Sequence, residues 1–169
     1  MLLDALEEAD VPAASVGKIY DVFLGRGIVA RFPSANNSEG MRQILAAMGE
    51  CERGLIWANL VDFDMLYGHR NDVEGYARAL EEFDRWLPEL DGALRQDDLV
   101  ILTADHGCDP TTASTDHSRE YVPLLVFGAR ARRGADLGVR ASLADIGQTV
   151  ADNFGARIGK GNSFLAQIL

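Results

Sequence analysis

Three histidines lie close to aspartates in this sequence, and these two residue types together can hold metal ions. The donors concerned are Asp64, His69, Asp105, His106 and His117. Carboxylate oxygens and neutral imidazole nitrogens are common ligands of Zn²⁺, Mn²⁺ and similar divalent ions. Five donors are too many for one tetrahedral ion with an open position, so they indicate parts of two metal sites. Enzymes with two metal ions, about 3.5–4 Å apart, use them to hold the attacking and leaving oxygens of a displacement.

Other polar residues near these donors have more ordinary interpretations. We expect Asp62 to be a hydrogen-bonding partner within a strand rather than a ligand. Asp109 and Asp116 stand in Asp-Pro and Thr-Asp pairs, which are ordinary turn sequences. Cys108 adjoins the donors, but a thiolate favours softer metals, so it is left out of the expected ligand set. Residue chemistry alone favours a surface position for Lys18.

The donors follow stretches that are expected to form β-strands. Two of them, Gly54–Asp64 and Leu99–Ala104, are almost continuous apolar runs, a pattern typical of strands covered on both faces in a parallel sheet. If the first strand runs straight to its end, Asp62 and Asp64 lie on the same face of it. Ligands of α/β sheets bind beyond the carboxyl ends of the strands, and Asp64 and Asp105 both stand at such ends.

Helices and strands alternate along the chain, which predicts an α/β fold with a mostly parallel sheet and helices on both faces. No repeat, linker or low-complexity tract divides the sequence, so we expect a single domain over residues 1–169. Residues 19–33 are expected to form loop with some extended pieces. The expected strands cover residues 13–16, 54–64, 99–104 and 122–127, and the expected helices cover 1–9, 38–49, 71–87 and 142–155.

Several residues mark the expected helix ends. Ser38 is expected to cap one helix, and Asn71 with Glu74 resembles a capping box at the start of another. Pro88 should kink or end this second helix near Leu87. Ser142, with an acidic residue three positions later, is expected to begin the last helix.

Composition limits the classes of function. The formal net charge of −10 argues against binding to a nucleic-acid backbone or an anionic membrane, because neither would be attracted over long range. No apolar run reaches the roughly 18 residues of a membrane span. The acidic N-terminus does not resemble a secretory signal, and two cysteines do not make a disulfide framework. We therefore expect a cytoplasmic protein.

The motifs resemble one known family. The runs NLVDFDMLYGHRNDVEGYARALEEFD and ILTADHGCDPTTASTDHSREYVPLLVFG are similar to the phosphopentomutase family, within the alkaline phosphatase superfamily of two-metal phosphoryl-transfer proteins. The resemblance extends from about Leu2 to the closing GNSFL, nearly the whole chain. ADHG alone is a weak superfamily mark. The donors in this order, with His117 inside TDHSREYVPLL, are more specific.

The resemblance implies a ligand set and cofactors. It implies two Mn²⁺ ions, although Mg²⁺ and Zn²⁺ tolerate parts of the same set. One ion would be held by Asp64, His69 and His117. The other would be held by Asp105 and His106, together with an aspartate from the family's N-terminal strand. Lys18, in VGKI, matches a lysine that in the family faces the sugar phosphate.

The resemblance also implies a reaction. The family interconverts ribose 1-phosphate and ribose 5-phosphate, and likewise the deoxyribose esters. The phosphoryl group is carried by a threonine between the metals, and a bisphosphate such as glucose 1,6-bisphosphate primes the enzyme. Two cations would neutralise charge on the phosphoryl group and hold the threonine oxygen in line.

The sequence departs from the family pattern in one large respect. Family members are more than twice as long, and the first strand, the nucleophilic threonine and the inserted cap domain have no counterpart here. None of the threonines near the expected metals stands in the nucleophile position; they are Thr103, Thr111, Thr112 and Thr115. We therefore expect an incomplete alkaline-phosphatase-like core that binds metal, does not isomerise ribose phosphates alone, and self-associates through an open sheet edge.

Two other functions stay open. A phosphohydrolase or related transferase of the same superfamily would share ADHG, although the TDHSREYVPLL run favours the mutase. A non-catalytic metal-binding or assembly module is supported by the absent threonine. An assay of phosphate monoesters and diesters against ribose 1-phosphate would separate the enzymes.

Overall fold

The computed structural model describes residues 1–169 and has the expected alternation of helices and strands. None of its helices combines the length and apolar character needed to cross a bilayer. The helices are α1 (Leu2–Glu8), α2 (Ile19–Val22), α3 (Asn37–Glu50), α4 (Val73–Ala93), α5 (Ala144–Asn153) and α6 (Leu165–Ile168). The strands are β1 (Ala13–Val16), β2 (Ala30–Phe32), β3 (Leu55–Ala58), β4 (Val100–Thr103) and β5 (Leu124–Phe127). A π-helix, η1 (Phe63–Tyr67), and a 3₁₀ helix, η2 (Gly68–Arg70), follow β3.

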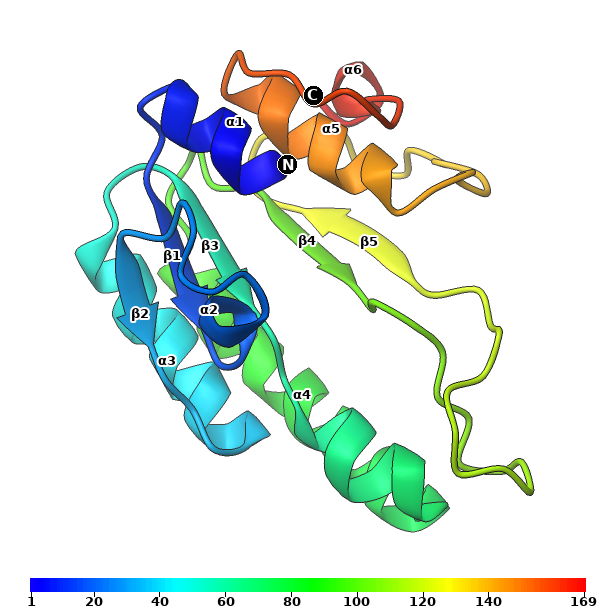
Figure 1. The fold of residues 1–169 in the computed structure, drawn as a ribbon. Coiled ribbons are helices and arrows are strands. Elements are labelled where there is room, and N and C mark those ends of the chain that lie inside the picture. Colours follow the sequence, from blue (N-terminus) through cyan, green and yellow to red (C-terminus); the bar gives the residue numbers. More distant parts are fainter.

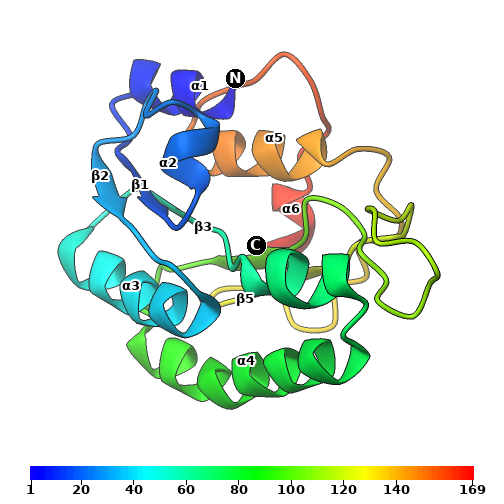
Figure 2. The same ribbon diagram turned by 60° about the horizontal axis from the view of Figure 1, so that its bottom comes forward.

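The strands form two separate sheets (Figure 1). One is parallel, in the order β2-β1-β3, with Ala14 opposite Ala30 on one side and Ile56 on the other. The second is an antiparallel pair of β4 and β5, with Ile101 opposite Val126. Figure 2 shows the strands between a layer that contains α3 and α4 and a layer that contains α1 and α5. This arrangement confirms the α/β class with helices on both faces.

The strands differ in how well they are covered. All four residues of β1 are buried, whereas those of β3 are only half-buried, and β4 and β5 are likewise incompletely covered. The expectation that the apolar runs before the donors are buried on both faces is therefore wrong. The reason is position: β3 is an edge strand of its sheet, β4 pairs only with β5, and no strand joins the two sheets.

The strand before the first donors is shorter than the sequence indicates. It ends at Ala58, so the strand does not run straight to Asp64, and the condition under which Asp62 and Asp64 would share one face is not met. Asp62 instead exchanges hydrogen bonds with Asn37: its carboxylate accepts from the Asn37 N–H at 2.8 Å, and its own N–H donates to Asn37 Oδ1 at 2.9 Å. These two bonds satisfy buried polar groups in the segment that follows the strand.

Two helices begin at neighbours of the expected caps. Asn36, not Ser38, caps α3, because its side chain accepts from the Glu39 N–H at 2.8 Å. Asp72 caps α4, while Asn71 adopts a left-handed conformation with φ of 51°. In each case the cap is the residue whose short side chain carries an oxygen that can accept from the N–H group three residues later.

Pro88 is expected to kink or end helix α4 near Leu87, and the expected end is wrong, because the helix continues through Pro88 to Ala93. Proline removes one backbone hydrogen bond within a helix. Burial opposes that loss, since Trp86 and Leu90 on either side of Pro88 pack with Met41 of α3 in one apolar cluster. Packing on the buried face keeps the second half of the helix in place.

The C-terminal segment is joined to α5 by a buried polar network. Ser142 accepts from the Ala144 N–H at 3.1 Å, but the N-cap of α5 is Leu143, so the expected start of this helix at Ser142 is wrong. Asp145 is not a capping residue: it is 2% exposed, and its carboxylate accepts from Arg140 Nε at 3.0 Å and from the Asn162 N–H at 2.8 Å. A short terminal helix, α6, which the sequence did not indicate, follows this network.

Replacing Asp145 with alanine should destabilise the chain by about 3 kcal/mol, because it leaves the Arg140 guanidinium and a backbone N–H without their buried partner. Urea unfolding followed by circular dichroism measures the change. The matched control is Asp97→Ala, which removes an ion pair to Arg130 between two exposed side chains and should cost less than about 1 kcal/mol. Equal effects of the two substitutions would contradict the assignment.

Candidate metal centre

The five predicted donors come from the two segments that follow β3 and β4. Asp64 lies in η1 and His69 in η2, directly after the parallel sheet. Asp105 and His106 follow β4, and His117 stands late in the loop that leads back to β5. The donors are thus carried by short irregular segments at the strand ends, where ligand sites of α/β folds usually lie.

A single β-bridge brings two of the histidines together. The Ser118 N–H donates to the Gly107 carbonyl at 2.9 Å, which closes the loop between β4 and β5. A side chain at Gly107 would not fit, because a Cβ there would lie 2.6 Å from the Ser118 carbonyl oxygen. Next to this bridge, the rings of His106 and His117 stack with their centroids 3.6 Å apart.

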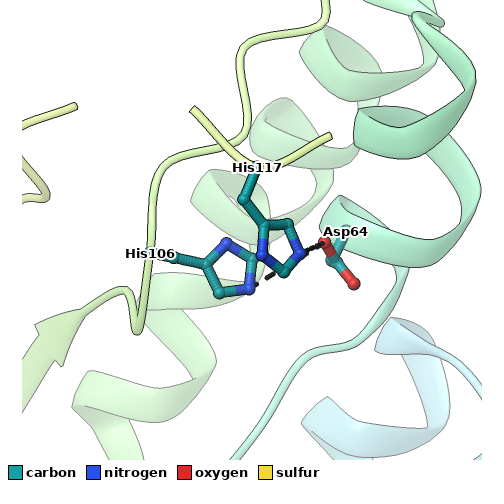
Figure 3. Close-up of side chains that lie close together, drawn as sticks. All are labelled: Asp64, His106 and His117. Atoms are coloured by element: carbon teal, nitrogen blue, oxygen red, sulfur yellow. Dashed lines mark ion pairs between the residues drawn. The ribbon is translucent and has the colours of Figure 1, made fainter. Parts of the chain in front are cut away.

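All three imidazoles present Nε2 to one oxygen, Oδ1 of Asp64. The distance from Nε2 to that oxygen is 3.2 Å for His69, 3.3 Å for His117 and 4.0 Å for His106. Figure 3 shows the stacked rings of His106 and His117 beside the carboxylate of Asp64. The structure therefore places all three histidines around the same carboxylate.

A hydrogen bond on the far side of the His69 ring determines which of its two nitrogens carries the proton. Nδ1 of His69 contacts the Thr115 carbonyl oxygen, which can only accept, so Nδ1 carries the proton. In the neutral ring Nε2 then has a lone pair directed at Oδ1 of Asp64. Two acceptors face one another with no hydrogen between them, and a cation between them removes the repulsion. Metal-bound histidines are commonly oriented by such a carbonyl.

The surroundings of the Asp64 carboxylate also favour a bound cation. Oδ1 of Asp64 is buried and receives no hydrogen bond, a costly state for a charged oxygen unless a positive charge compensates it. The nearest ligand atoms of Asp64, His106 and His117 lie within 4.8 Å of one another. One carboxylate and neutral imidazoles are donors that Mn²⁺ and Zn²⁺ accept. These residues therefore fit a divalent metal ion.

Asp105 and Lys18 stand further out. Asp105 is 77% exposed, and its Oδ1 lies 3.7 Å from Nε2 of His106, which places that ring between the two carboxylates. Lys18 is exposed at the end of β1, and its Nζ lies 2.6 Å from Sδ of Met65, the residue after Asp64. The lysine thus reaches the segment that carries Asp64, without contacting a histidine.

The aspartates expected to have structural roles differ in their surroundings. Oδ1 of Asp109 accepts from both the N–H and the hydroxyl of Thr111, at 2.9 and 2.7 Å, and these hydrogen bonds lower the pKa of Asp109. Its turn role is confirmed. Asp116 lies in a bend of the same loop. Asp62 is a hydrogen-bonding residue as expected, although it lies outside any strand.

Two groups near the centre were not among the expected functional residues. Burial raises the pKa of the Cys108 thiol, and the negative charges of Asp64 and Asp109 raise it further. Burial likewise raises the pKa of Tyr76, with smaller contributions from Cys108, Asp64 and Asp109. Both groups thus lie in a partly desolvated region close to the carboxylates of Asp64 and Asp109. Only the position of Cys108 after ADHG could have indicated this from the sequence.

Comparisons with known proteins agree with the geometry. The chain is 57% identical over 167 residues to a phosphopentomutase from an Anaeromyxobacter species, a match that covers 99% of this chain and 43% of that protein. It is 52% identical over 170 residues to a phosphopentomutase from Desulfitobacterium hafniense, which covers 100% of this chain and 44% of that protein. The chain thus spans less than half the length of these curated relatives.

The fold also has a counterpart among solved structures. Phosphoglycerate mutase from Leishmania mexicana superposes with a TM-score of 0.71 and 19% sequence identity, over 94% of this chain and 37% of that protein. At this identity the likeness shows the fold alone. A model of the metalloenzyme superfamily matches residues 24–158, which include all five donors. With most of its length matched and three histidines gathered around Asp64, the chain belongs to the metalloenzyme superfamily.

Proposed function

We propose that this chain is the metal-holding part of a phosphopentomutase, which interconverts ribose 1-phosphate, or deoxyribose 1-phosphate, and the corresponding 5-phosphate. Identities of 52–57% to curated phosphopentomutases over nearly the whole chain support the activity. The observation that carries the proposal is the approach of three imidazole nitrogens to the buried, unpaired Oδ1 of Asp64. Phosphoryl transfer needs cations at such a place.

The proposed cofactors are two Mn²⁺ ions, with Mg²⁺ and Zn²⁺ as alternatives. Asp64, His69 and His117 would hold one ion, and Asp105 and His106 would hold part of the other. His106 supports this division, because its Nε2 lies 3.7 Å from Asp105 and 4.0 Å from Asp64 and can serve a neighbouring ion. The remaining aspartate ligand would come from the part of the relatives that this chain does not match.

The chain's own groups would prepare the site for a phosphorylated sugar. The Thr115 carbonyl orients His69, and the bridge at Gly107 holds the two stacked histidines. Lys18 would bind the phosphate of the sugar, since its exposed amino group already lies beside the segment of Asp64. Bound metal ions would supply charge neutralisation of the phosphoryl group and alignment of the attacking oxygen.

Other features of the proposal follow from the family. The threonine that carries the phosphoryl group would lie outside the matched part, and a bisphosphate such as glucose 1,6-bisphosphate would prime it. The substrate is thus a sugar phosphate, and the net charge of −10 speaks against nucleic acid or an anionic membrane as partner. We propose that residues 1–169 act as one partial core domain in the cytoplasm.

Asp64→Asn should weaken Mn²⁺ binding to this chain by at least about tenfold, because even the loss of a residue that only supports a metal ligand commonly costs that much. Isothermal titration calorimetry at fixed pH measures the affinity. Asp97→Asn, which alters an exposed carboxylate of the same charge, should leave it unchanged. Equal Mn²⁺ affinity in the Asp64 variant and the unaltered chain would refute the metal site.

The isolated chain should bind Mn²⁺ yet give no interconversion of ribose 1-phosphate and ribose 5-phosphate, because it does not supply the phosphorylated threonine. Phosphorus NMR with Mn²⁺ and glucose 1,6-bisphosphate monitors both esters. The positive control is a full-length homologous phosphopentomutase under the same conditions. Turnover by the isolated chain would show that it contains a nucleophile of its own.

The isolated chain should also self-associate. Strands β3 and β4 each have one hydrogen-bonding edge without a partner strand, and exposed edges favour pairing with another chain. Multi-angle light scattering over a range of concentrations should therefore give a mass above that of one chain, 18.4 kDa. A constant mass of one chain at all concentrations would contradict this expectation.

A further inference from the structure

Cys108 lies against the metal centre and has no role in the proposed reaction. We propose that Asp64, His69 and Cys108 form a second, thiolate-containing site that selects Zn²⁺ and similar thiophilic cations. This inference deepens the proposed function and rests on its metal site, because the two sites share Asp64 and His69. The two-Mn²⁺ arrangement does not include the Cys108 sulfur as a donor or thiophilic cations as the bound ions. It also does not include competition between such cations and Mn²⁺ for Asp64 and His69.

The position of the thiol is enforced by its neighbours. A Cβ built on Gly68 would lie 2.4 Å from Sγ of Cys108, so the absence of a side chain at position 68 makes the room that the sulfur occupies. Gly68 itself is buried and directly precedes His69. The sulfur is therefore held against the same turn that carries one of the histidine donors.

The three donor atoms are near enough to share one ion. Sγ of Cys108, a carboxylate oxygen of Asp64 and a ring nitrogen of His69 all lie within 4.8 Å of one another, and Nε2 of His69 is 3.2 Å from Oδ1 of Asp64. Small side-chain rotations would bring all three within the roughly 2.0–2.3 Å typical of Zn²⁺ ligands. Three protein donors leave a fourth tetrahedral position for water or a phosphate oxygen.

The chemistry of the donors sets the preference. Mn²⁺ and Mg²⁺ favour oxygen and nitrogen, whereas sulfur draws Zn²⁺, Cd²⁺ and Co²⁺ more strongly. On binding, the thiol proton of Cys108 leaves to solvent and the sulfur forms the bond to the ion. Since Asp64 and His69 would also serve Mn²⁺ with His117, an ion held by the sulfur displaces Mn²⁺ from that position.

Cobalt is the probe that reports sulfur directly. Co²⁺ bound to a thiolate has an intense near-ultraviolet charge-transfer absorption, which oxygen and nitrogen ligands do not produce. Titration of the unaltered chain with Co²⁺ should produce this absorption, and Cys108→Ser should abolish it. Cys51→Ser is the matched control, since Cys51 is the other free thiol and packs against the core around Val16; it should leave the absorption intact.

Two further variants test which donors accompany the sulfur. Asp64→Asn should strongly reduce the charge-transfer absorption, whereas His117→Ala should retain it, because His117 belongs only to the Mn²⁺ arrangement. In calorimetric titrations Cys108→Ser should weaken Zn²⁺ binding by at least about tenfold while it leaves Mn²⁺ affinity within about twofold, given the size of effects near metal ligands. Circular dichroism of each variant checks that it is folded.

The outcomes separate this inference from the proposed function. Co²⁺ binding without the charge-transfer absorption, absence of Co²⁺ binding, or an unchanged Zn²⁺ affinity in Cys108→Ser would overturn the thiolate site. If Mn²⁺ binds normally in that case, the proposed function stands. If the absorption appears and depends on Cys108 while Mn²⁺ fails to bind, the thiolate site stands and the two-Mn²⁺ proposal falls.

Discussion

The candidate metal centre depends on one contact: the ring nitrogens of three histidines approach a single carboxylate oxygen of Asp64. Asp64 Oδ1 is buried, accepts no hydrogen bond, and has the Nε2 atoms of His69 and His117 within 3.3 Å. A divalent cation satisfies the lone pairs of the carboxylate and of several rings at once, which no single proton does.

The surrounding structure explains how these donors are held in place. Asp64 comes from a π-helix, an uncommon conformation that often occurs at functional sites. His69 is oriented from behind by the Thr115 carbonyl, and a backbone bridge next to His106 and His117 closes their loop. Backbone groups that hydrogen-bond to ligands keep their rings oriented, so the donors need little reorganisation when a cation binds.

The sequence predicted the larger features and missed those that depend on tertiary contacts. The alternation of apolar runs and amphipathic stretches was sufficient for the α/β class, and the histidines after strand ends indicated the three rings that the structure brings to Asp64. Sequence patterns could not reveal the buried bonds between Asp62 and Asn37, because these join residues far apart in the chain. They also could not show that Cys108 reaches His69, since only the missing side chain of Gly68 makes room for its sulfur.

The paired hydrogen bonds between Asp62 and Asn37 have one more consequence. They join the backbone two residues before Asp64 to the first residue of α3, so the donor segment is tied directly to the start of this helix. Local opening of the donor segment would break the hydrogen bond from the Asn37 N–H to the Asp62 carboxylate. The Asn37 amide hydrogen could then exchange with solvent. Occupancy by a cation would then slow amide exchange at the first residue of α3.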